Sequence, residues 1–258
     1  GTTLFTALQA GFSALLSRLG AGDDVVIGTV VAGRQRRELE DLVGFLANTV
    51  AQRHHVDPLA SFEEHVRATT DVVLAAFEHQ QVPFEAVVEA IAPVRAMGHA
   101  PLVQVLLVLQ NTPQPEAALR LPGLEATPFD QDADAAQFEL SLNLTETAEG
   151  LGGTLSYASQ VFDRETVERL AAMFVRLLGV AAKAPETLVA DLPLMDEAAR
   201  HQVVALFNDT AVDDPHGHTL MDMFDEHVTA RPDAIALIFE DVRLSYSALN
   251  VAASRLAA

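Results

Sequence analysis

The sequence predicts an α/β fold built on a central sheet, and two neighbouring segments carry that prediction. Apolar residues recur at the spacing of one helical face in residues 5–19, and the pattern stops at Gly20. A β-branched run without polar alternation follows in residues 25–31, as expected for a strand covered on both faces. Half of the residues are hydrophobic and aromatic residues are sparse, a composition that suits a packed globular protein.

Further helices and strands are predicted after this first pair. We expect a second strand within residues 46–56 and a helix with one apolar side across residues 62–77. Pro83 opens a third helix, because a proline at the first helical position lacks an N–H group that would be unpaired there. The apolar side chains of residues 84–91 are expected to form that helix's buried face, and a buried strand is expected in residues 103–109.

A β-hairpin and a long helix are predicted in the second half of the chain. Residues 138–145 alternate apolar with polar side chains, and a turn at residues 149–153 leads into a strand at residues 154–157. Asp163 is placed to cap the helix that follows. Residues 112–134, before the hairpin, carry four prolines and are interpreted as an extended segment.

These elements divide the chain into a compact unit at residues 1–184, a linker with one short helix at residues 185–218, and a second unit at residues 219–258. The second unit is expected to hold a helix, a strand at residues 235–239 and the start of another helix at Ser245. About forty residues cannot bury a sizeable core alone, so we expect a truncated domain. The chain also opens without Met, which favours a piece of a longer protein.

The composition excludes several classes of partner and chemistry. A formal net charge of -20 gives a surface that repels nucleic acid and anionic lipid head groups. No apolar run approaches the roughly 18 residues that cross a bilayer, and the first residues lack the pattern of a secretion signal. Without Cys there is no disulfide, thiol nucleophile or zinc–thiolate cluster. We therefore expect a cytoplasmic protein with no nucleic-acid partner and no membrane partner.

Several catalytic and ligand-binding patterns are absent from the sequence. It contains no Gly-x-Ser-x-Gly elbow and no Gly-rich loop ending in Gly-Lys-Ser/Thr, and Gly150, Gly152 and Gly153 are expected in a hairpin turn. His216 and His218 lie in the proline-flanked linker without a carboxylate at ligand spacing, so solvated histidines are favoured over a metal site. We predict no bound metal.

The pair His54-His55, followed by Asp57, resembles part of a general-base motif found in acyltransferases. Alternation along a strand would place the two rings on opposite faces of the sheet. We therefore favour a strand with one buried and one exposed histidine.

Five stretches occur in a fixed order at residues 25–34, 40–53, 79–85, 95–102 and 219–250. The first four read VVIGTVVAGR, EDLVGFLANTVAQR, HQQVPFE and RAMGHAPL, which resemble IVIGTPVAGR, GFFVNTLxxR, HQDxPFE and RxxSRxPL of the condensation domains of nonribosomal peptide synthetases. The fifth contains LSYSALN and resembles the opening of adenylation domains, and the residues before it look like the usual linker between the two.

This chain departs from the family motifs at a few positions. Gln81 stands where Asp is usual, and Gly98 and His99 stand at the Ser and Arg positions of the fourth motif. The motif residues that we expect to be structural are Gly28, Arg34, Gly44, Phe45, Arg53, His79, Gln80, Pro83, Phe84, Arg95 and Pro101.

The resemblance implies a chloramphenicol-acetyltransferase-like lobe, with a mixed sheet flanked by helices. Two such lobes form a V in this family, and the phosphopantetheine arms of two carrier proteins enter a tunnel between them. The domain forms a peptide bond between aminoacyl and peptidyl thioesters, in the biosynthesis of secondary metabolites such as antibiotics. The implied partners are peptidyl and aminoacyl carrier proteins, an amino-terminal condensation lobe and the remainder of an adenylation domain, and no cofactor is expected on these residues themselves.

The family's catalytic histidine belongs to a His-His-x-x-x-Asp-Gly motif of the amino-terminal lobe, and this sequence does not contain that motif. After His54-His55, the positions that need Asp and Gly hold Leu59 and Ala60. We therefore expect no catalytic residue and no activity from these residues alone, because the reaction needs a positioned base and both thioesters held together.

Asn48 and Thr49 are the candidates for polar groups that line the substrate tunnel near the reacting carbonyl. The alternative is that they cap the end of a strand. By resemblance, residues 112–134 include the segment that crosses towards the other lobe.

Two other functions compete with peptide-bond formation. One is a noncatalytic condensation-like module that docks carrier or partner proteins. The other is a free acetyltransferase-like enzyme that uses coenzyme A thioesters, which the adenylation-like stretch at residues 219–250 disfavours.

Overall fold

A computed structural model describes residues 2–92, 100–110, 136–147, 150–211, 217 and 219–257. The chain forms two compact units, Gly1–Ala198 and Ala199–Ala258. Arg95, the segment predicted to cross at residues 112–134, and the histidines His216 and His218 lie outside the described residues.

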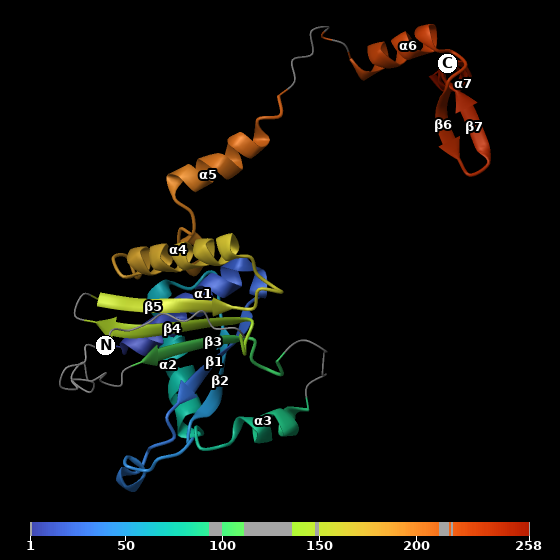
Figure 1. The fold of residues 1–258 in the computed structure, drawn as a ribbon. Helices are drawn as coiled ribbons and strands as arrows, with labels where there is room; N and C mark the ends of the chain where they lie inside the picture. The colour runs from blue at the N-terminus through green and yellow to red at the C-terminus, as the bar shows by residue number, and fades with distance from the viewer. Residues whose placement is uncertain are drawn as a thin grey trace, which may run out of the picture. The chain divides into compact units, whose positions relative to one another are not determined.

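A five-stranded mixed sheet forms the body of the first unit (Figure 1). Its order is β2-β1-β3-β4-β5, and the strands are β1 (Asp24–Val31), β2 (Asn48–His55), β3 (Val105–Gln110), β4 (Leu140–Thr147) and β5 (Gly150–Tyr157). β3 pairs in parallel with β1 and β4, whereas β1 with β2 and β4 with β5 are antiparallel pairs. The mixed sheet expected from the sequence is confirmed.

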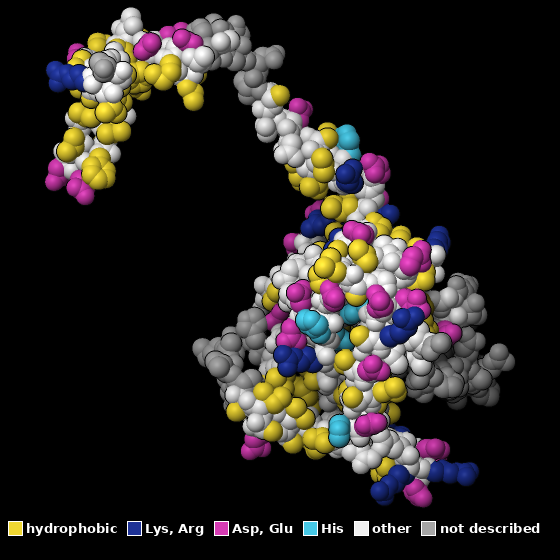
Figure 2. Space-filling view, turned by 180° about the vertical axis from the view of Figure 1, so that it is seen from behind, with side chains coloured by type: hydrophobic (Ala, Val, Ile, Leu, Met, Phe, Trp, Pro, Cys, Tyr) yellow, Lys and Arg dark blue, Asp and Glu magenta, His cyan; other side chains and the backbone are white. Residues whose placement is uncertain are grey.

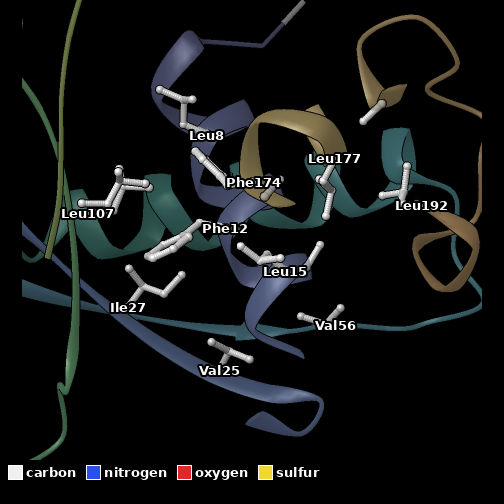
Figure 3. Close-up of a cluster of buried hydrophobic side chains, with 14 of the residues drawn as sticks. Leu8, Phe12, Leu15, Val25, Ile27, Val56, Leu107, Phe174, Leu177 and Leu192 are labelled. Atoms are coloured by element: carbon white, nitrogen blue, oxygen red, sulfur yellow. The ribbon is translucent and has the colours of Figure 1, made fainter. Parts of the chain in front are cut away.

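Three helices bury one face of this sheet: α1 (Leu4–Leu16), α2 (Phe62–Glu78) and α4 (Arg164–Ala181). In Figure 3, Phe12 of α1 lies above Ile27 of β1, close to Phe174 of α4. The rings of Phe12 and Phe174 meet edge to face with their centroids 5.5 Å apart. Apolar side chains of β1, β3 and β4 complete this core, as the predicted apolar runs require.

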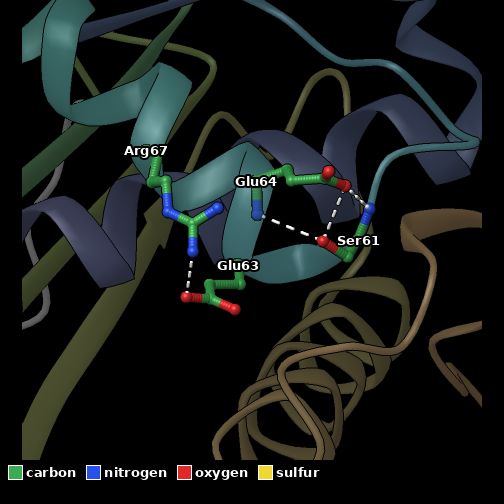
Figure 4. Close-up of polar contacts among 4 residues, drawn as sticks. All are labelled: Ser61, Glu63, Glu64 and Arg67. Atoms are coloured by element: carbon green, nitrogen blue, oxygen red, sulfur yellow. Dashed lines mark hydrogen bonds and ion pairs between the residues drawn. The ribbon is translucent and has the colours of Figure 1, made fainter.

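Side-chain caps fix the starts of two of these helices. Asp163 accepts a 2.7 Å hydrogen bond from the Thr166 N–H at the start of α4, as the sequence predicts. Figure 4 shows the capping box of α2, in which the Glu64 carboxylate accepts hydrogen bonds from both the backbone N–H (2.8 Å) and the hydroxyl (2.7 Å) of Ser61. These two bonds lower the pKa of Glu64, and an ion pair between Arg67 and Glu63 follows one turn later.

The first part of the predicted linker packs into the first unit. The Phe62 N–H donates to Thr187 O at 2.9 Å, and the Val189 N–H donates to Ala60 O at 2.9 Å. Val189 and Leu192 are fully buried. Arg18 donates to the carbonyls of both residues at 2.8 Å, so one guanidinium ties this segment to the end of α1.

The prediction that α3 (Phe84–Ile91) has a buried face is wrong for its described residues, since none of them is buried and Ile91 is 59% exposed. Helical periodicity finds an apolar face without showing what covers it. Pro83 also stands one position earlier than expected, at the N-cap of α3.

The turn predicted at residues 149–153, between β4 and β5, is longer than the turn in the structure, because β5 already begins at Gly150. Gly152 and Gly153 pair with Thr145 and Leu144 inside the ladder, and the register continues to Gly150 opposite Thr147. At Gly153 a Cβ atom would overlap the Asn143 carbonyl oxygen of the neighbouring strand. Gly153 therefore lies within a strand, where the absence of a side chain allows the two strands to approach closely.

The second unit contains α6 (Leu220–Ala230), β6 (Ile235–Phe239), β7 (Val242–Ser245) and α7 (Tyr246–Ala257). The sequence predicts all of these except β7, which pairs with β6 after a turn at Glu240 (φ 51°). None of the described residues of the second unit is buried, and hydrophobic side chains form much of the surface of this unit that Figure 2 shows. The predicted short helix of the linker is α5 (Glu197–Val204).

Short turns of 3-10 helix at Arg37–Leu39, Val189–Asp191 and Leu206–Asn208, and a π-helical turn at Ser17–Ala21, complete the described secondary structure. Across the described part of the chain, no helix combines the length and apolarity that a bilayer crossing requires.

Arg18→Met should lower the free energy of unfolding of the first unit by about 1–3 kcal/mol, because two buried carbonyls lose a charged donor while the alkyl stem stays. Urea denaturation at pH 7 measures this. Arg67→Ala, at an exposed ion pair, is the control and should cost less than about 0.5 kcal/mol. Equal effects of the two substitutions would contradict a special role for Arg18.

Candidate functional site

The loop between β1 and β2 is held in one conformation by an arginine of the first motif. Arg34 donates to Leu42 O at 3.0 Å, Gly44 O at 3.3 Å and Ala32 O at 3.3 Å. Gly33 has φ 67°, and a Cβ atom there would overlap the carbonyl oxygen of Leu46 across the loop. The two residues together close the base of this loop.

The closed loop presents two apolar side chains to solvent. Val43 is 99% exposed and Phe45 is 92% exposed. We call residues 42–45 the hairpin tip, and they belong to the loop that projects beyond β1 and β2 (Figure 1). Large apolar side chains so exposed on a fastened loop are typical of a surface that another chain segment covers.

Asn48 joins the second motif to the third. Its Nδ2 donates to Gln80 O at 2.9 Å and to Val82 O at 2.7 Å, and its Oδ1 accepts from the Phe84 N–H at 3.1 Å. Pro83 has no side-chain cap of its own for α3, so the amide of Asn48 satisfies an otherwise unpaired N–H at the start of that helix. We call these three bonds the Asn48 clasp.

The two candidates for the substrate tunnel therefore differ in their surroundings. The Asn48 side chain forms hydrogen bonds within the protein and caps α3. The sequence suggests a tunnel-lining group or a cap at the end of a strand, and neither of these is a cap of α3. Thr49 lies opposite Val30 on the other face of β2, and its hydroxyl makes no hydrogen bond with the described residues. A role for either residue near a reacting carbonyl stays a prediction.

The remaining described motif residues make packing and surface contacts. A Cβ atom at Gly28 would lie 2.6 Å from Val103 Cγ1 and 2.9 Å from Leu106 Cδ1, so β1 and the segment leading into β3 pack closely there. Arg53 forms an exposed ion pair with Asp24 at 2.6 Å, and this hydrogen bond lowers the pKa of the Asp24 carboxyl. Gln80 donates to Phe77 O at 2.8 Å, while His79 and Pro101 are exposed.

The structure confirms that His54 and His55 lie on opposite faces of β2. His54 is 1% exposed, whereas His55 is exposed to solvent. The pair cannot act on one substrate from one side of the strand.

A buried polar layer, which sequence reasoning missed, lies between α1, α2 and β2. It comprises Gln9 and Ser13 of α1, Gln52 and His54 of β2, and His65 and Thr69 of α2, all buried. The Ser13 hydroxyl is hydrogen-bonded to His65 Nε2 at 2.9 Å and to Ala10 O at 3.1 Å. The side-chain polar atoms of Gln9, Gln52, His54 and Thr69 have no partner among the described residues.

The sequence held one signal for this layer. Gln9 falls on the apolar face of its helix, and Gln52 and His54 alternate in phase with the buried Val50 and Val56.

Both histidines of the buried polar layer are neutral at pH 7. Burial lowers the pKa of His54 to about 4, and the nearby His65 adds to this lowering. Burial also lowers the pKa of His65. Leu4–Leu16 contains no ionisable residue, so α1 offers no counter-charge. Ser13 and His65 are 0% and 3% exposed, so this hydroxyl–imidazole pair has no access for a substrate.

No three His, Asp or Glu side chains of the described residues come together as a metal site would require. The geometry that remains is a fastened, apolar hairpin tip beside the Asn48 clasp, which suits contact with another protein surface.

The comparisons with known proteins identify a family. A family model described as "Condensation domain" matches residues 1–204. The chain is 42% identical over 266 residues to the phosphinothricin tripeptide synthetase PhsB of Streptomyces viridochromogenes, covering all of this chain and 22% of that protein. The chain thus spans less than a quarter of the length of this relative.

Two solved structures share the fold. The X-domain from teicoplanin biosynthesis is 30% identical with a TM-score of 0.69, over 75% of this chain and 44% of that one. A four-domain nonribosomal peptide synthetase, holo-AB3403 bound to AMP and glycine, is 24% identical with a TM-score of 0.72, over 96% of this chain and 20% of that one.

Asn48→Ala should release the start of α3, because the Phe84 N–H and the carbonyls of Gln80 and Val82 lose their partner. Hydrogen exchange of the amides at residues 80–86 should accelerate at least tenfold, corresponding to about 1.4 kcal/mol. Thr49→Val is the matched control on the adjacent residue and should leave exchange unchanged. Unchanged exchange in Asn48→Ala would show that the clasp does not hold this segment.

Stability of the first unit should fall as the pH drops from about 6.5 towards 4. The pKa of His54 is lower in the folded than in the unfolded chain, so the unfolded chain binds more protons in this window. The expected loss from His54 is about 3 kcal/mol at the acid end. Urea unfolding between pH 4.5 and 7.5 measures it.

His54→Leu should flatten this pH dependence, and the exposed neighbour substitution His55→Gln should not. If His54→Leu and the unchanged protein lose stability in parallel, His54 is not the origin of the acid sensitivity.

Proposed function

The chain belongs to the condensation-domain family of nonribosomal peptide synthetases, and we propose that residues 1–184 act as the carboxy-terminal lobe of such a domain. In this proposal the complete domain joins aminoacyl and peptidyl thioesters held on the phosphopantetheine arms of carrier proteins. The observation that carries it is the family match together with similarity to a tripeptide synthetase over the whole chain.

We propose that the lobe is inactive by itself. The 258 residues contain no His-His-x-x-x-Asp-Gly motif, and the described histidines form no accessible base beside a nucleophile. The matched part makes up 44% of the X-domain chain, which is consistent with a second lobe of comparable size. The base would then come from that lobe.

The hairpin tip is the surface that we assign to the other lobe. Arg34 fixes it through the carbonyls of Leu42 and Gly44, so little conformational freedom would be lost on docking. Phe45 has the size and exposure of an aromatic anchor that fills a pocket on a partner.

We further propose that residues 219–258 begin an adenylation domain whose remainder covers them. Similarity to the tripeptide synthetase extends over all of these residues, and the fold of the four-domain synthetase covers 96% of the chain. The absence of any buried side chain among residues 219–257 supports completion by further chain.

A second candidate function is a noncatalytic module that docks partner proteins. The similarity to an X-domain favours it, because a structure of that X-domain is a complex with another protein, OxyB. The two candidates differ in whether the domain, completed by a second lobe, forms a peptide bond.

The deciding experiment mixes this chain with two loaded carrier proteins, with and without a separately produced amino-terminal condensation lobe of the same parent. Dipeptidyl product should appear in the complete mixture and not without the lobe, because the base and the second wall of the tunnel are then absent. Product from the chain alone would overturn the proposal. Absence of product although the lobes associate would favour the docking module.

Phe45→Ala should weaken association of the two lobes at least tenfold, since truncating an aromatic anchor costs about 2 kcal/mol. Calorimetric titration of one lobe with the other measures this. Leu74→Ala, at a 58% exposed position of α2, is the matched control and should bind as the unchanged chain does.

A further inference from the structure

An apolar cavity of about 180 Å³ lies in the first unit between α1, α4 and the β4–β5 pair. Phe12 and Leu15 line it from α1, Leu142 and Leu144 from β4, and Phe174 and Ala171 from α4. Four of these six side chains belong to α1 or β4 and are buried, and so is Phe174, so the inner wall of the cavity is formed by the core.

Small residues explain why the space is unfilled. Gly153 lies opposite Leu144 in the β4–β5 ladder and gives no side chain between Leu151 and Leu155. Ala171 faces the same space from α4 with a single methyl group. A side chain cannot be added at Gly153 without overlap with the neighbouring strand, so the gap is built into the hairpin.

The side chains that line the cavity are almost all apolar, so they favour an apolar ligand. Leu, Phe, Ala and Gly side chains offer no hydrogen bonds, and the sole polar side chain of the lining is Thr154, which is exposed on β5. A water molecule needs two to four polar partners, and an apolar cavity of about 150 Å³ in another protein stays dry and binds benzene or xenon. The cavity described here has a similar volume and a similarly apolar lining, and it opens to the surface beside Leu151 and Val175.

A route into the cavity lies along the edge strand. Leu151 and Val175, at 46% and 70% exposure, are lining residues that also reach the surface. β5 is the edge strand next to the cavity. Gly152 and Gly153 have no side chains that could cover the space between β5 and α4.

We propose that this cavity is a binding site for one small, uncharged apolar molecule of about the size of a benzene ring. The site is separate from the hairpin tip and from the Asn48 clasp, and it does not depend on the proposed function. Its ligand class is set by volume and by the absence of polar partners in the lining. Aromatic rings and short branched alkyl groups meet both conditions.

Titration of the 258-residue chain with benzene, followed by calorimetry, tests the proposal. The chain should show saturable binding of one benzene molecule. Ala171→Leu fills the cavity and should weaken binding at least tenfold, and Ala171→Met, whose flexible side chain adapts to irregular gaps, should do the same. Ala172→Leu places the same side chain on the exposed neighbouring position and should bind as the unchanged chain does.

Circular dichroism establishes that each variant is folded, and a crystal under xenon pressure gives a second readout on the unchanged chain. Xenon density among Phe12, Leu142 and Phe174 is expected. Saturable binding that Ala171→Leu and Ala171→Met leave intact would place benzene elsewhere and overturn the proposal. The proposal also fails if the unchanged chain shows neither saturable heat nor xenon in the cavity.

Discussion

The first unit depends on a helix that is buried on every side. Nine of the thirteen residues of α1 are buried, and none of them is ionisable. At Gly11 the backbone of α1 comes so close to Leu178 of α4 that a Cβ atom would overlap it. The sheet, α2, α4 and, through Arg18, the segment at residues 187–192 all use α1 as their common contact. A helix apolar on most sides is stable in water only inside such a layer.

The family motifs mostly fasten segments to this body. Arg34 closes the loop between β1 and β2, Asn48 ties β2 to the start of α3, and Gly28 admits Val103 beside β1. Each of these contacts joins residues that are distant in the sequence and close in the fold. The result is a fixed hairpin tip whose apolar side chains, Val43 and Phe45, remain exposed beside the described residues, which is why we propose a protein-contact surface for this region.

Sequence reasoning succeeded where one local rule decides the outcome. The strand at β1 follows from a β-branched run, and the start of α4 follows from Asp163, because a cap acts on its own helix. It failed where a distant segment decides. The uncovered side of α3 and the pairing of Gly153 with Leu144 depend on what the fold places opposite them.

The buried polar layer shows the same limit. Gln9, Gln52 and His65 each look like an isolated exception to an apolar pattern, and only the packing of three elements brings them together.

The two sides of α1 constrain it in different ways. Towards α4, α1 makes a close contact at Gly11, whereas the cavity shows that the side chains of Phe12, Leu15 and Phe174 leave space beside it. Towards α2, the Ser13–His65 bond is directional and joins the two helices.

The Ser13–His65 hydrogen bond selects one rotation of α1 about its axis. In any other rotation both side chains would be buried without this hydrogen bond. The Ser13–His65 bond and the close contact at Gly11 therefore both constrain α1, and the space beside Phe12 is tolerated. Ala171 lines the cavity from α4 and His54 lies in the buried polar layer on β2, so changes at the two sites should act on stability independently.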